Sequence, residues 1–369
     1  MVVPEPRVAI VLPPREGFSP DAVGAVGLLV HRLSDPSDLI LGRAVAGPVF
    51  ADRRFLPVQP AGFPVLGAGR QYAAGVARIL RRAPPDLIEV HNRPEVALAL
   101  ARRLPGIPVA LFLHNDPQGM RFARTPRARR ALARRMRIVV VSEHLRRRFR
   151  DGLDATPVTV LPNCLDLSLL PPARPVAARD PLILFVGRLV ADKGADSFVA
   201  ACAQALPQLP GWRAEMIGAD RFTPFGVETR FEAHLRSTAA RAGVVLDGYR
   251  PHAAVLEAMA RAAIVVMPSR WAEPFGLTAL EAMASGAALL CSGRGGLAEL
   301  ATAGTAVIVD PDLPGALGTA LQQLAGDPAV RARLAGAAWE RARSFDLPAA
   351  RCRLAAMRTG MLSKPIEPF

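Results

Sequence analysis

Short apolar runs alternate with helical stretches along nearly the whole chain, and this alternation limits the possible folds more than any other feature. It favours parallel sheets with helices on both faces, in a doubly wound α/β arrangement. In the first half, strands are expected at residues 8–12, 86–91, 109–114, 138–142 and 158–161, with others between 39 and 58. In the second half, they are expected at residues 182–186, 214–217, 244–247, 264–267, 288–291 and 306–309.

The alternation stops at a proline-rich stretch, Pro171 to Pro175, and starts again at Leu182. A chain of 369 residues is long enough for two domains that each bury a core. We therefore expect an N-terminal domain over residues 1–172 and a second domain over residues 173–347. The last helices are expected at about residues 328–344 and 348–361. Because 51% of the residues are hydrophobic, a disordered chain is not expected.

One segment, residues 264–286, combines an apolar run, a loop that holds a carboxylate, and a helix. The carboxylate is Glu273, and the helix is expected to begin near Gly276 and to end at Gly286. Glu281 would then lie about one turn inside the helix, roughly 6 Å from its start.

The free N–H groups of Leu277 and Thr278 would form an anion site at the start of this helix. A carboxylate on each side of a phosphate site suits a nucleotide diphosphate-sugar, with ribose hydroxyls on one side and sugar hydroxyls on the other. The alternative is a solvated helix face, on which acidic residues are stabilised by the helix dipole.

A second feature is the rarity of lysine, which occurs only at Lys193 and at Lys364. An arginine-rich chain with one internal lysine suggests a site that needs a compact ammonium group. Arg188 and Lys193 follow the apolar run at residues 182–186, so both would lie at the carboxyl end of a parallel strand. Open α/β sheets bind their ligands at this edge. The alternative is a surface lysine without a role.

Together these segments resemble the family 4 retaining glycosyltransferases of the GT-B fold. The matching motifs in the second half are Gly187-Arg188-Leu189, Lys193-Gly194, Asp247-Gly248-Tyr249, Pro268-Ser269, Glu273-Pro274-Phe275-Gly276-Leu277, Leu280-Glu281-Ala282-Met283-Ala284-Ser285-Gly286 and Gly296-Leu297-Ala298-Glu299. The first half matches more loosely, through Val90-His91-Asn92-Arg93-Pro94, Leu113-His114-Asn115-Asp116 and Leu161-Pro162-Asn163. The chain is similar to bacterial transferases of capsule, lipopolysaccharide and spore-coat polysaccharides.

The resemblance implies two Rossmann-like domains that face a central cleft. The first would be the acceptor-side domain, with the helix over residues 348–369 packed back on it, and the second would bind the nucleotide-sugar. The implied activity is retaining transfer of a hexosyl group to a lipid-linked or cell-surface glycan. A UDP-sugar is the preferred donor, and a GDP-sugar is the alternative.

The resemblance also assigns roles to residues. Glu273 would contact the transferred sugar and Glu281 the ribose, while His114 would lie near the sugar, and a catalytic role is expected for His114 and Glu273. The implied donor-binding residues are Gly24, Arg188, Lys193, Phe275, Gly276, Leu277, Thr278 and Glu281. Asn92, Arg93 and Asn115 are candidates for the acceptor side. Two alternatives stay open, namely a covalent nucleophile role for Glu273 and a purely structural role for His114.

The chain departs from the family pattern at three places. The Gly-Gly pair that usually touches the phosphates reads Ala22-Val23-Gly24-Ala25, so only Gly24 carries over. Cys164 follows Asn163 where glycine is common, and Asp192 precedes Lys193 where glutamate is frequent. The first departure leaves the phosphate contact from the first domain in doubt.

No cofactor or metal ion is expected. Asp310-Pro311-Asp312 has the form of a metal-binding Asp-x-Asp motif, but it follows a strand far from the donor segments and reads as a turn. The leaving diphosphate would then be stabilised by Arg188, Lys193 and the helix start. Preorganised donors of this kind can each contribute roughly 2.7–4 kcal/mol.

The formal net charge of +14 is concentrated between Arg121 and Arg150. This basic region includes Arg127, Arg129, Arg130, Arg134, Arg135, Arg146, Arg147 and Arg148. Such a patch could contact an anionic membrane, at roughly 1 kcal/mol per basic residue. Because only 5% of the residues are aromatic, nucleic-acid binding is not expected. The alternative is a solvated arginine-rich face.

Other features indicate a cytoplasmic protein, with peripheral contact at the inner face of the membrane. The first twelve residues predict a strand rather than a signal peptide, and no apolar stretch approaches ~20 residues. The four cysteines are scattered, which is typical of buried thiols in a reducing compartment.

The sequence also bears on three other functions. A dinucleotide oxidoreductase needs Gly-x-Gly-x-x-Gly after an early strand, but Pro13-Pro14-Arg15-Glu16-Gly17 follows the first one. A nucleotide-sugar epimerase of related fold stays open, as does a decayed transferase that acts as a binding subunit. The complete set Arg188, Lys193, Glu273 and Glu281 favours an active transferase.

Overall fold

The computed structural model describes residues 6–20, 23–62, 67–172, 174–220 and 228–363. Ala22 and Lys364, which were discussed above, fall outside these ranges. The chain forms two compact units. Unit 1 contains residues Met1–Cys164 and Leu347–Phe369, and unit 2 contains residues Leu165–Asp346.

The division lies after Cys164, whereas the sequence predicted it after Pro172. Backbone contacts explain the difference, because the segment after Cys164 is already attached to the end of unit 2. The Leu165 N–H donates to the carbonyl oxygen of Phe345 at 3.0 Å. The proline-rich stretch therefore lies within unit 2 and does not mark its start.

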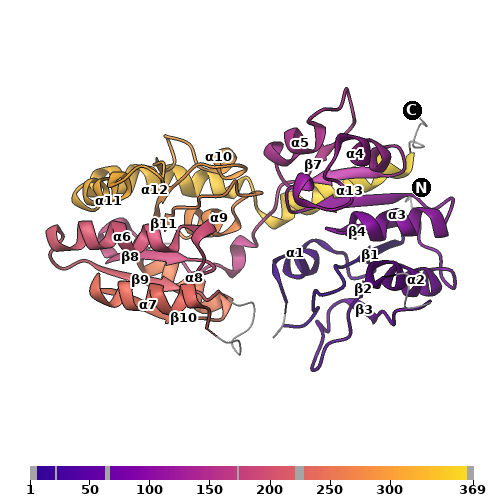
Figure 1. Ribbon diagram of the computed structural model, residues 1–369, viewed down its shortest axis with the longest axis horizontal. Helices are drawn as coiled ribbons and strands as arrows, with labels where there is room; N and C mark the ends of the chain where they lie inside the picture. The colour runs from indigo at the N-terminus through magenta and orange to yellow at the C-terminus, as the bar shows by residue number, and fades with distance from the viewer. Residues whose placement is uncertain (1–5, 21–22, 63–66, 173, 221–227, 364–369) are drawn as a thin grey trace. The chain divides into compact units, whose positions relative to one another are not determined.

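Unit 1 is built on a seven-stranded parallel sheet with the order β3-β2-β1-β4-β5-β6-β7 (Figure 1). Its strands are β1 (Val8–Val11), β2 (Leu39–Gly42), β3 (Arg54–Pro57), β4 (Leu87–His91), β5 (Val109–Leu113), β6 (Arg137–Val140) and β7 (Thr159–Val160). Its α-helices are α1 (Ala25–Leu33), α2 (Ala68–Leu80), α3 (Pro94–Arg103), α4 (Pro126–Ala133), α5 (Glu143–Arg150) and α13 (Leu347–Ser363). β1 and β4 are buried along their whole lengths, as expected for parallel strands covered on both faces.

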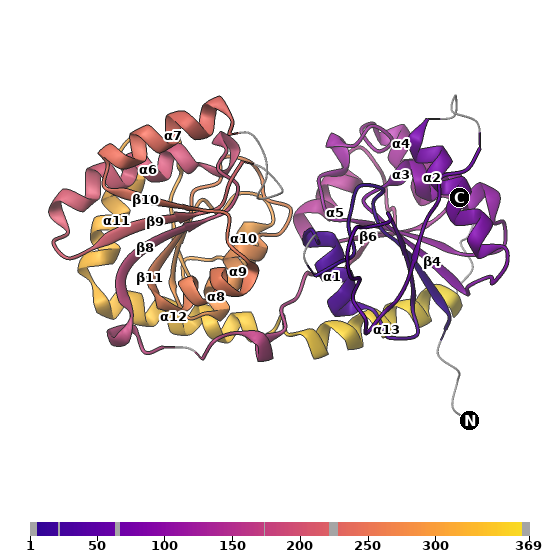
Figure 2. The ribbon, with the colours of Figure 1, turned by 90° about the horizontal axis from the view of Figure 1, so that it is seen from below.

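Unit 2 repeats this architecture with a six-stranded parallel sheet in the order β10-β9-β8-β11-β12-β13. Its strands are β8 (Asp180–Val186), β9 (Arg213–Ile217), β10 (Val244–Gly248), β11 (Ala262–Met267), β12 (Ala288–Cys291) and β13 (Val307–Ile308). Its α-helices are α6 (Ala195–Ala205), α7 (Arg230–Arg241), α8 (His252–Arg261), α9 (Leu277–Ala284), α10 (Leu297–Leu300), α11 (Ala316–Gly326) and α12 (Pro328–Arg343). The helices cover both faces of the sheet (Figure 2).

The predicted doubly wound α/β fold is confirmed, and each strand range expected from the sequence overlaps an observed strand. The strand order reverses at β1 in unit 1 and at β8 in unit 2. Ligands of open α/β sheets bind beyond the carboxyl ends of the strands at such switch points. The polar loops that follow β8 and β11, and β1 and β4, are therefore the places to examine for a site.

The last helix, α13, belongs to unit 1 and lies along it in Figure 2. Leu354 and Met361 of α13 join the apolar core of the first sheet. Arg358 is buried with them and donates to both oxygens of Glu89 at 2.8 and 2.9 Å, and to Asp38 at 3.0 Å. A buried charge is tolerated only when it is paired in this way, so α13 is held by both apolar and ionic contacts.

No helix within the described ranges is long and apolar enough to cross a membrane.

Candidate active site

The carboxyl edge of the second sheet brings the loops after β8 and β11 into direct backbone contact. Gly194 has φ of +70°, and a Cβ atom there would lie 2.0 Å from the carbonyl oxygen of Pro268. Only glycine permits this approach together with this backbone conformation. The loop that carries Lys193 is thereby held against the loop that carries Glu273.

Lys193 and Glu273 form an ion pair at this edge. The Lys193 Nζ atom donates to Glu273 Oε1 at 2.7 Å and to Oε2 at 2.9 Å. The hydroxyl group of Ser269 donates to Glu273 Oε1 at 2.5 Å. The Glu273 side chain is 5% exposed and the Lys193 side chain 27% exposed, so the ammonium group lies on the solvent side of the pair. The structure thus brings together two of the predicted site residues that lie 80 positions apart.

Trp271 extends this cluster, and the sequence analysis did not identify it. Lys193 Nζ lies 5.1 Å from the centre of the Trp271 ring, within the range of a cation–π interaction. The indole is partly exposed beside the ammonium group. Its position two residues before Glu273, in the loop already singled out, was the available signal.

The loop of Glu273 is also bound to the loop after β12. Glu273 N–H donates to the carbonyl oxygen of Arg294 at 3.2 Å, and Gly296 N–H donates to that of Glu273 at 2.6 Å. Gly295 has φ of +69°, and a Cβ atom there would lie 2.4 Å from the Glu273 carbonyl oxygen. The close approach of Gly295 and the hydrogen bond from Gly296 therefore position the Glu273 backbone.

The Asp310-Pro311-Asp312 motif forms a turn, as predicted. Its two carboxylates accept hydrogen bonds from Arg294 at 2.5 and 2.7 Å. Arg294 also donates to the carbonyl oxygen of Arg270 at 2.7 Å. The motif thus links the loop after β13 to the loops around Glu273.

Helix α9 begins at Leu277, directly after Gly276, close to the predicted start. Leu277 and Thr278 are half-buried at this helix start. Phe275 is 3% exposed, and its ring packs edge-to-face against Phe345 with centroids 5.8 Å apart. Phe275 therefore supports the loop through its side chain, and only its backbone remains for the predicted donor contact.

Glu281 has a different partner from Glu273. His252 Nε2 lies 2.7 Å from Glu281 Oε1, and the carboxylate is mostly buried while the imidazole is partly exposed. His252 is the first residue of α8 and was missed by the sequence analysis. The signal was its place just after the Asp247-Gly248-Tyr249 motif.

Arg188 forms an ion pair with Asp220, with 3.0 Å between Nη2 and Oδ1. Its side chain is substantially exposed. Asp220 directly precedes residues 221–227, which lie outside the described ranges. The predicted role of Arg188 at the diphosphate thus requires exchange of this carboxylate for the phosphate groups.

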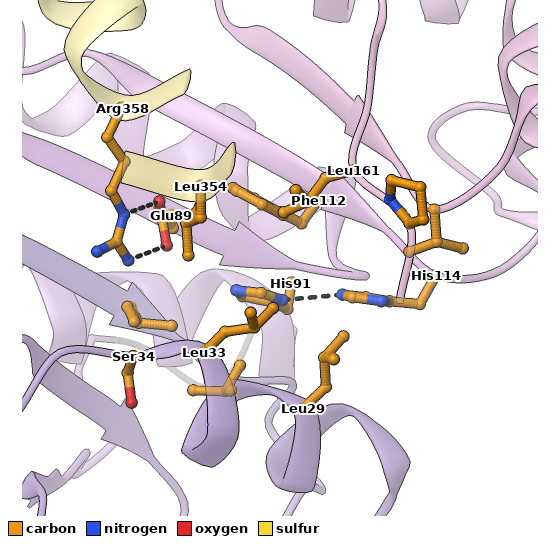
Figure 3. Close-up of a pocket in the computed structure, with 14 residues that line it drawn as sticks. Leu29, Leu33, Ser34, Glu89, His91, Phe112, His114, Leu161, Leu354 and Arg358 are labelled. Carbon is orange, nitrogen blue, oxygen red and sulfur yellow. Dashed lines mark hydrogen bonds and ion pairs between the residues drawn. The ribbon is translucent and has the colours of Figure 1, made fainter. Parts of the chain in front are cut away.

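In unit 1, His114 follows β5 and lies beside His91 at the end of β4 (Figure 3). His91 Nδ1 and His114 Nε2 are 2.9 Å apart, with the two rings 12° from coplanar. Burial lowers the pKa of His91 to about 3, helped by the charge of Arg358. Burial also lowers the pKa of His114 well below its ordinary value, with a smaller contribution from His91. Both imidazoles are therefore neutral at pH 7.

The three predicted acceptor-side residues differ in their surroundings. Asn92 is buried in the left-handed region with φ of +54°, and its Oδ1 atom accepts from the His114 N–H at 2.8 Å. Arg93 donates to the carbonyl oxygen of Asn92 at 2.8 Å. Asn115 is exposed. Asn92 thus holds the backbone of His114, while the side chain of Asn115 faces solvent.

Gly24 caps α1, where a phosphate contact was predicted. The Glu16 carboxylate accepts from the Gly27 N–H at 2.9 Å and lies against Gly24. A carboxylate in the first turn of a helix fills the position that an anionic ligand would take. Gly24 can therefore contact a phosphate group only if Glu16 moves.

Two predictions about individual residues need correction. Arg129 was included in the basic surface region, but it is 1% exposed and donates to the carbonyl oxygens of Phe149, Ala123, Arg124 and Asp151. It closes local turns, because buried carbonyl groups need donors. Cys164, Cys202 and Cys291 are buried as expected, but Cys352 is exposed on α13.

Comparison with known families assigns both units. A family model described as Glycosyltransferase Family 4 matches residues 14–169, and one described as Glycosyl transferases group 1 matches residues 171–341. The chain belongs to these glycosyltransferases. The predicted glycosyltransferase family is thereby confirmed, while its retaining stereochemistry stays a prediction.

Curated relatives match part of the chain. It is 34% identical to glycogen synthase of Mycobacterium tuberculosis (strain ATCC 25618 / H37Rv) over 197 residues, which are 51% of this chain and 45% of that protein. It is 31% identical to the lipopolysaccharide core biosynthesis mannosyltransferase LpcC of Rhizobium leguminosarum bv. viciae over 242 residues, which are 63% and 65% of the two chains. The chain thus spans about half the length of the first relative and somewhat more of the second.

Solved structures show the same fold. The structure of Anabaena Alr3699/HepE in complex with UDP-glucose superimposes with a TM-score of 0.76 at 21% identity. The match covers 96% of this chain and 99% of that chain. The GT-B fold of this glycosyltransferase is therefore established.

The contact between Gly295 and Glu273 gives a first prediction. Gly295→Ala should destabilise unit 2 by roughly 1–3 kcal/mol more than Gly315→Ala in urea unfolding. Gly315 has a similar φ of +74°, but its nearest neighbour is a Gln204 side-chain atom at 3.6 Å. The control therefore carries only the strain of an alanine in the left-handed region, roughly 1–2 kcal/mol. Equal losses of stability in the two variants would mean that the Glu273 loop can move away from the added Cβ atom at little energetic cost.

The buried histidines give a second prediction. Both stay neutral when folded and take up protons on unfolding, because their folded pKa values lie below the ordinary value. The free energy of unfolding should therefore fall as the pH drops below about 6.5, by up to roughly 1.4 kcal/mol per pH unit for each histidine. Urea unfolding between about pH 7 and pH 5 measures this slope.

Two variants test the assignment of this slope. His91→Phe/His114→Phe should show a smaller pH dependence than the wild type over the same range. His234→Phe, which changes an exposed histidine on α7, should leave it unaltered. If the double variant keeps the full slope, other groups are responsible for it.

Proposed function

We propose that this glycosyltransferase moves a hexosyl group from a nucleotide diphosphate-sugar to a lipid-linked or cell-surface glycan, with retention of configuration and without a metal ion. The observation that carries the proposal is the cluster of Lys193, Glu273 and Ser269 at the switch point of the second sheet. Sheet edges of this kind bind nucleotides. The cluster combines a cation for phosphate with a carboxylate for sugar hydroxyls.

Lys193 has the position that a diphosphate contact requires. Its ammonium group is held by the mostly buried Glu273 on one side and remains partly exposed on the other. An incoming diphosphate would approach the exposed side and share the cation with Glu273. Lysine suits this double contact because its three donors can point in different directions.

Glu273 is better suited to bind the sugar than to attack it. Both of its carboxylate oxygens already accept hydrogen bonds, from Lys193 and Ser269. Such bonds stabilise the negative charge and lower its nucleophilicity. Oε1 accepts from both Lys193 and Ser269, while Oε2 accepts from Lys193 and keeps a lone pair for a sugar hydroxyl. The structure therefore favours a sugar-binding role over a covalent intermediate.

Glu281 would bind the ribose through the same chemistry. Its Oε1 atom is paired with His252. A ribose hydroxyl would donate to the remaining carboxylate lone pairs or replace the imidazole. His252 thus becomes part of the proposed nucleoside side of the site.

In the reaction, the oxygen of an acceptor hydroxyl forms a bond to the anomeric carbon while the bond from that carbon to the diphosphate breaks. The acceptor proton passes to the departing phosphate oxygen, on the same face of the sugar. Lys193 and the N-terminus of α9 stabilise the charge that develops on the diphosphate. Arg188 would add a second cation after leaving Asp220.

Metal independence is part of the proposal and is supported by the pairing of the two aspartates. Asp310 and Asp312 are both paired with Arg294 and lie in a turn, so they are engaged in holding loops together. The negative charge of the leaving diphosphate would instead be stabilised by Lys193 and the N-terminus of α9. A UDP-sugar is the first donor class to test, supported by the UDP-glucose complex of Alr3699/HepE, and a GDP-sugar is the second.

Nucleotide binding gives the third prediction. In a thermal-shift panel of UDP, GDP, ADP and TDP, one nucleotide should raise the unfolding midpoint of the wild type by several degrees, with or without EDTA. Lys193→Met should lose this shift, because it loses the cation. Glu273→Gln should keep it and lose sugar transfer. Arg213→Met, which removes an exposed ion pair with Asp180, is the matched control.

The outcomes separate the alternatives. A shift that disappears with EDTA would contradict metal independence, and normal transfer by Glu273→Gln would contradict the assignment of the sugar contact. Conversion of the donor sugar without any acceptor would indicate an epimerase. Binding of all four nucleotides alike, without transfer, would indicate a decayed transferase.

We also propose that unit 1 contacts anionic membrane through a basic surface on α4 and the loop before it. Arg127, Arg130 and Arg134 are exposed and recur at helical spacing. Phe122 is exposed nearby, with the Arg121 guanidinium 5.5 Å from its ring centre. Exposed arginines beside an aromatic ring suit an acidic lipid surface.

Vesicle binding gives the fourth prediction. Arg127→Glu/Arg130→Glu/Arg134→Glu should weaken binding to phosphatidylglycerol vesicles by about 100-fold, at roughly 1 kcal/mol per removed arginine. Arg230→Glu/Arg236→Glu/Arg241→Glu on α7 makes the same change in net charge and should have a smaller effect. If the two variants weaken vesicle binding equally, binding depends on net charge alone, and the α4 surface is not the membrane contact.

A further inference from the structure

His91 is a buried titratable residue that the proposed reaction does not yet use. It ends β4, is 5% exposed, and stacks on Phe112 with centroids 4.9 Å apart. Its Nδ1 atom is 2.9 Å from His114 Nε2, in nearly coplanar geometry. One of the two nitrogens must be the N–H donor and the other the acceptor, so the hydrogen bond has a direction.

The surroundings of the other ring nitrogen of His91, Nε2, decide the direction of this hydrogen bond. Figure 3 shows the His91 ring in a pocket of unit 1 that is lined by residues of β4, α1 and α13, with Leu33 on one side of the ring and Phe112 and Leu354 on the other. The Nε2 atom is buried and has no hydrogen-bond partner within the described part of the chain. A neutral imidazole has one N–H donor and one acceptor nitrogen, so Nε2 carries either a proton or a lone pair.

The two possible arrangements differ in energy. If His114 donated from Nε2, the His91 proton would have to lie on Nε2, which would leave an N–H group buried without an acceptor. Unpaired buried N–H groups are rarer than unpaired acceptors and cost about 1–3 kcal/mol. If His91 donates from Nδ1, its buried Nε2 atom keeps only an unpaired lone pair, and the free N–H group lies on His114 Nδ1, which is not among the buried atoms without a partner. The second arrangement is therefore favoured.

We propose that His91 is a positioning residue that donates from Nδ1 to His114 Nε2 and thereby fixes the proton of His114 on its outer nitrogen, Nδ1. His114 Nδ1 has no partner among the described residues. His114 thus offers a neutral hydrogen-bond donor to a ligand and has no free basic nitrogen.

The consequence for the reaction rests on the proposed function, with His114 near the transferred sugar as the family resemblance implies. A donor at Nδ1 can bind a sugar oxygen, but it cannot accept the proton of the acceptor hydroxyl. That proton then goes to another acceptor, which in the same-face reaction proposed above is the departing phosphate oxygen. His91 therefore selects among the possible chemical roles of His114.

The surroundings keep the pair in this geometry. Asn92 Oδ1 accepts from the His114 N–H and fixes the start of its loop. Glu89, two residues before His91 on β4, is paired with Arg358, and this pair lines the same pocket. The guanidinium group disfavours a second proton on His91.

The direct test is the tautomer of each ring, read from long-range ¹H–¹⁵N NMR spectra of the full-length protein without ligand. The chain has six histidines, and the signals of the pair are assigned from His91→Phe and His114→Phe. We expect the proton on Nδ1 in both His91 and His114. A proton on Nε2 of His114 in the wild type would overturn the proposal.

Two substitutions separate donation from simple packing. His91→Asn places an amide N–H group near the position of Nδ1 and should keep the His114 proton on Nδ1. His91→Phe keeps a ring without a donor and should release His114 to the other tautomer. Circular dichroism and thermal unfolding show whether each variant is folded. An unchanged His114 tautomer in folded His91→Phe would contradict the proposal.

Turnover provides a second and separable readout, with UDP-glucose as the probe donor. His91→Phe should lower the rate about tenfold, in proportion to one hydrogen bond, and His91→Asn should restore most of it. If the tautomers are as proposed but His114→Phe keeps full activity, the proposed role of His114 fails while the role of His91 in the pair stands.

Discussion

The ion pair between Lys193 and Glu273 is the contact on which the candidate donor site depends. Neither residue could be placed by its own loop alone, because each loop is held by backbone contacts to another. Gly194 lets the first loop approach Pro268, and Gly295 lets the loop after β12 approach Glu273. A carboxylate this buried requires a cation, so the position of each charge supports that of the other.

In unit 1, too, a buried charged group needs a partner of opposite charge. Its pocket contains the Glu89–Arg358 ion pair and the two histidines, all mostly removed from water. The carboxylate and the guanidinium stay charged because they are paired. The two histidines have no acidic partner in the part of the chain that the structure describes, and burial keeps them neutral by lowering their pKa values. Burial thus produces an ionic contact that attaches α13 and a neutral pair that can direct a hydrogen bond.

The fold and much of the site could be predicted from local patterns. Apolar runs located the strands, and the segment around Glu273 located a loop and the start of α9 correctly. The histidine partners could not be predicted, because His252 and Glu281 lie on different helices, and His91 and His114 on different strands. Arg129 was misjudged for a related reason, because the carbonyl groups that bury it include that of Phe149, which is distant in the sequence. Glu16 at the start of α1 likewise gave no local signal.

The sequence by itself determined the strand and helix periods, the glycine-bounded loops and the chemical types at the site, because these depend on neighbours in the chain. Only the tertiary structure decided which groups are paired, which are buried and which charges survive. Lys193 and Glu273 meet because parallel strands bring their carboxyl ends to one edge. Whether Arg188 faces Asp220, or His114 faces His91, depends on distances that no pattern along the chain records.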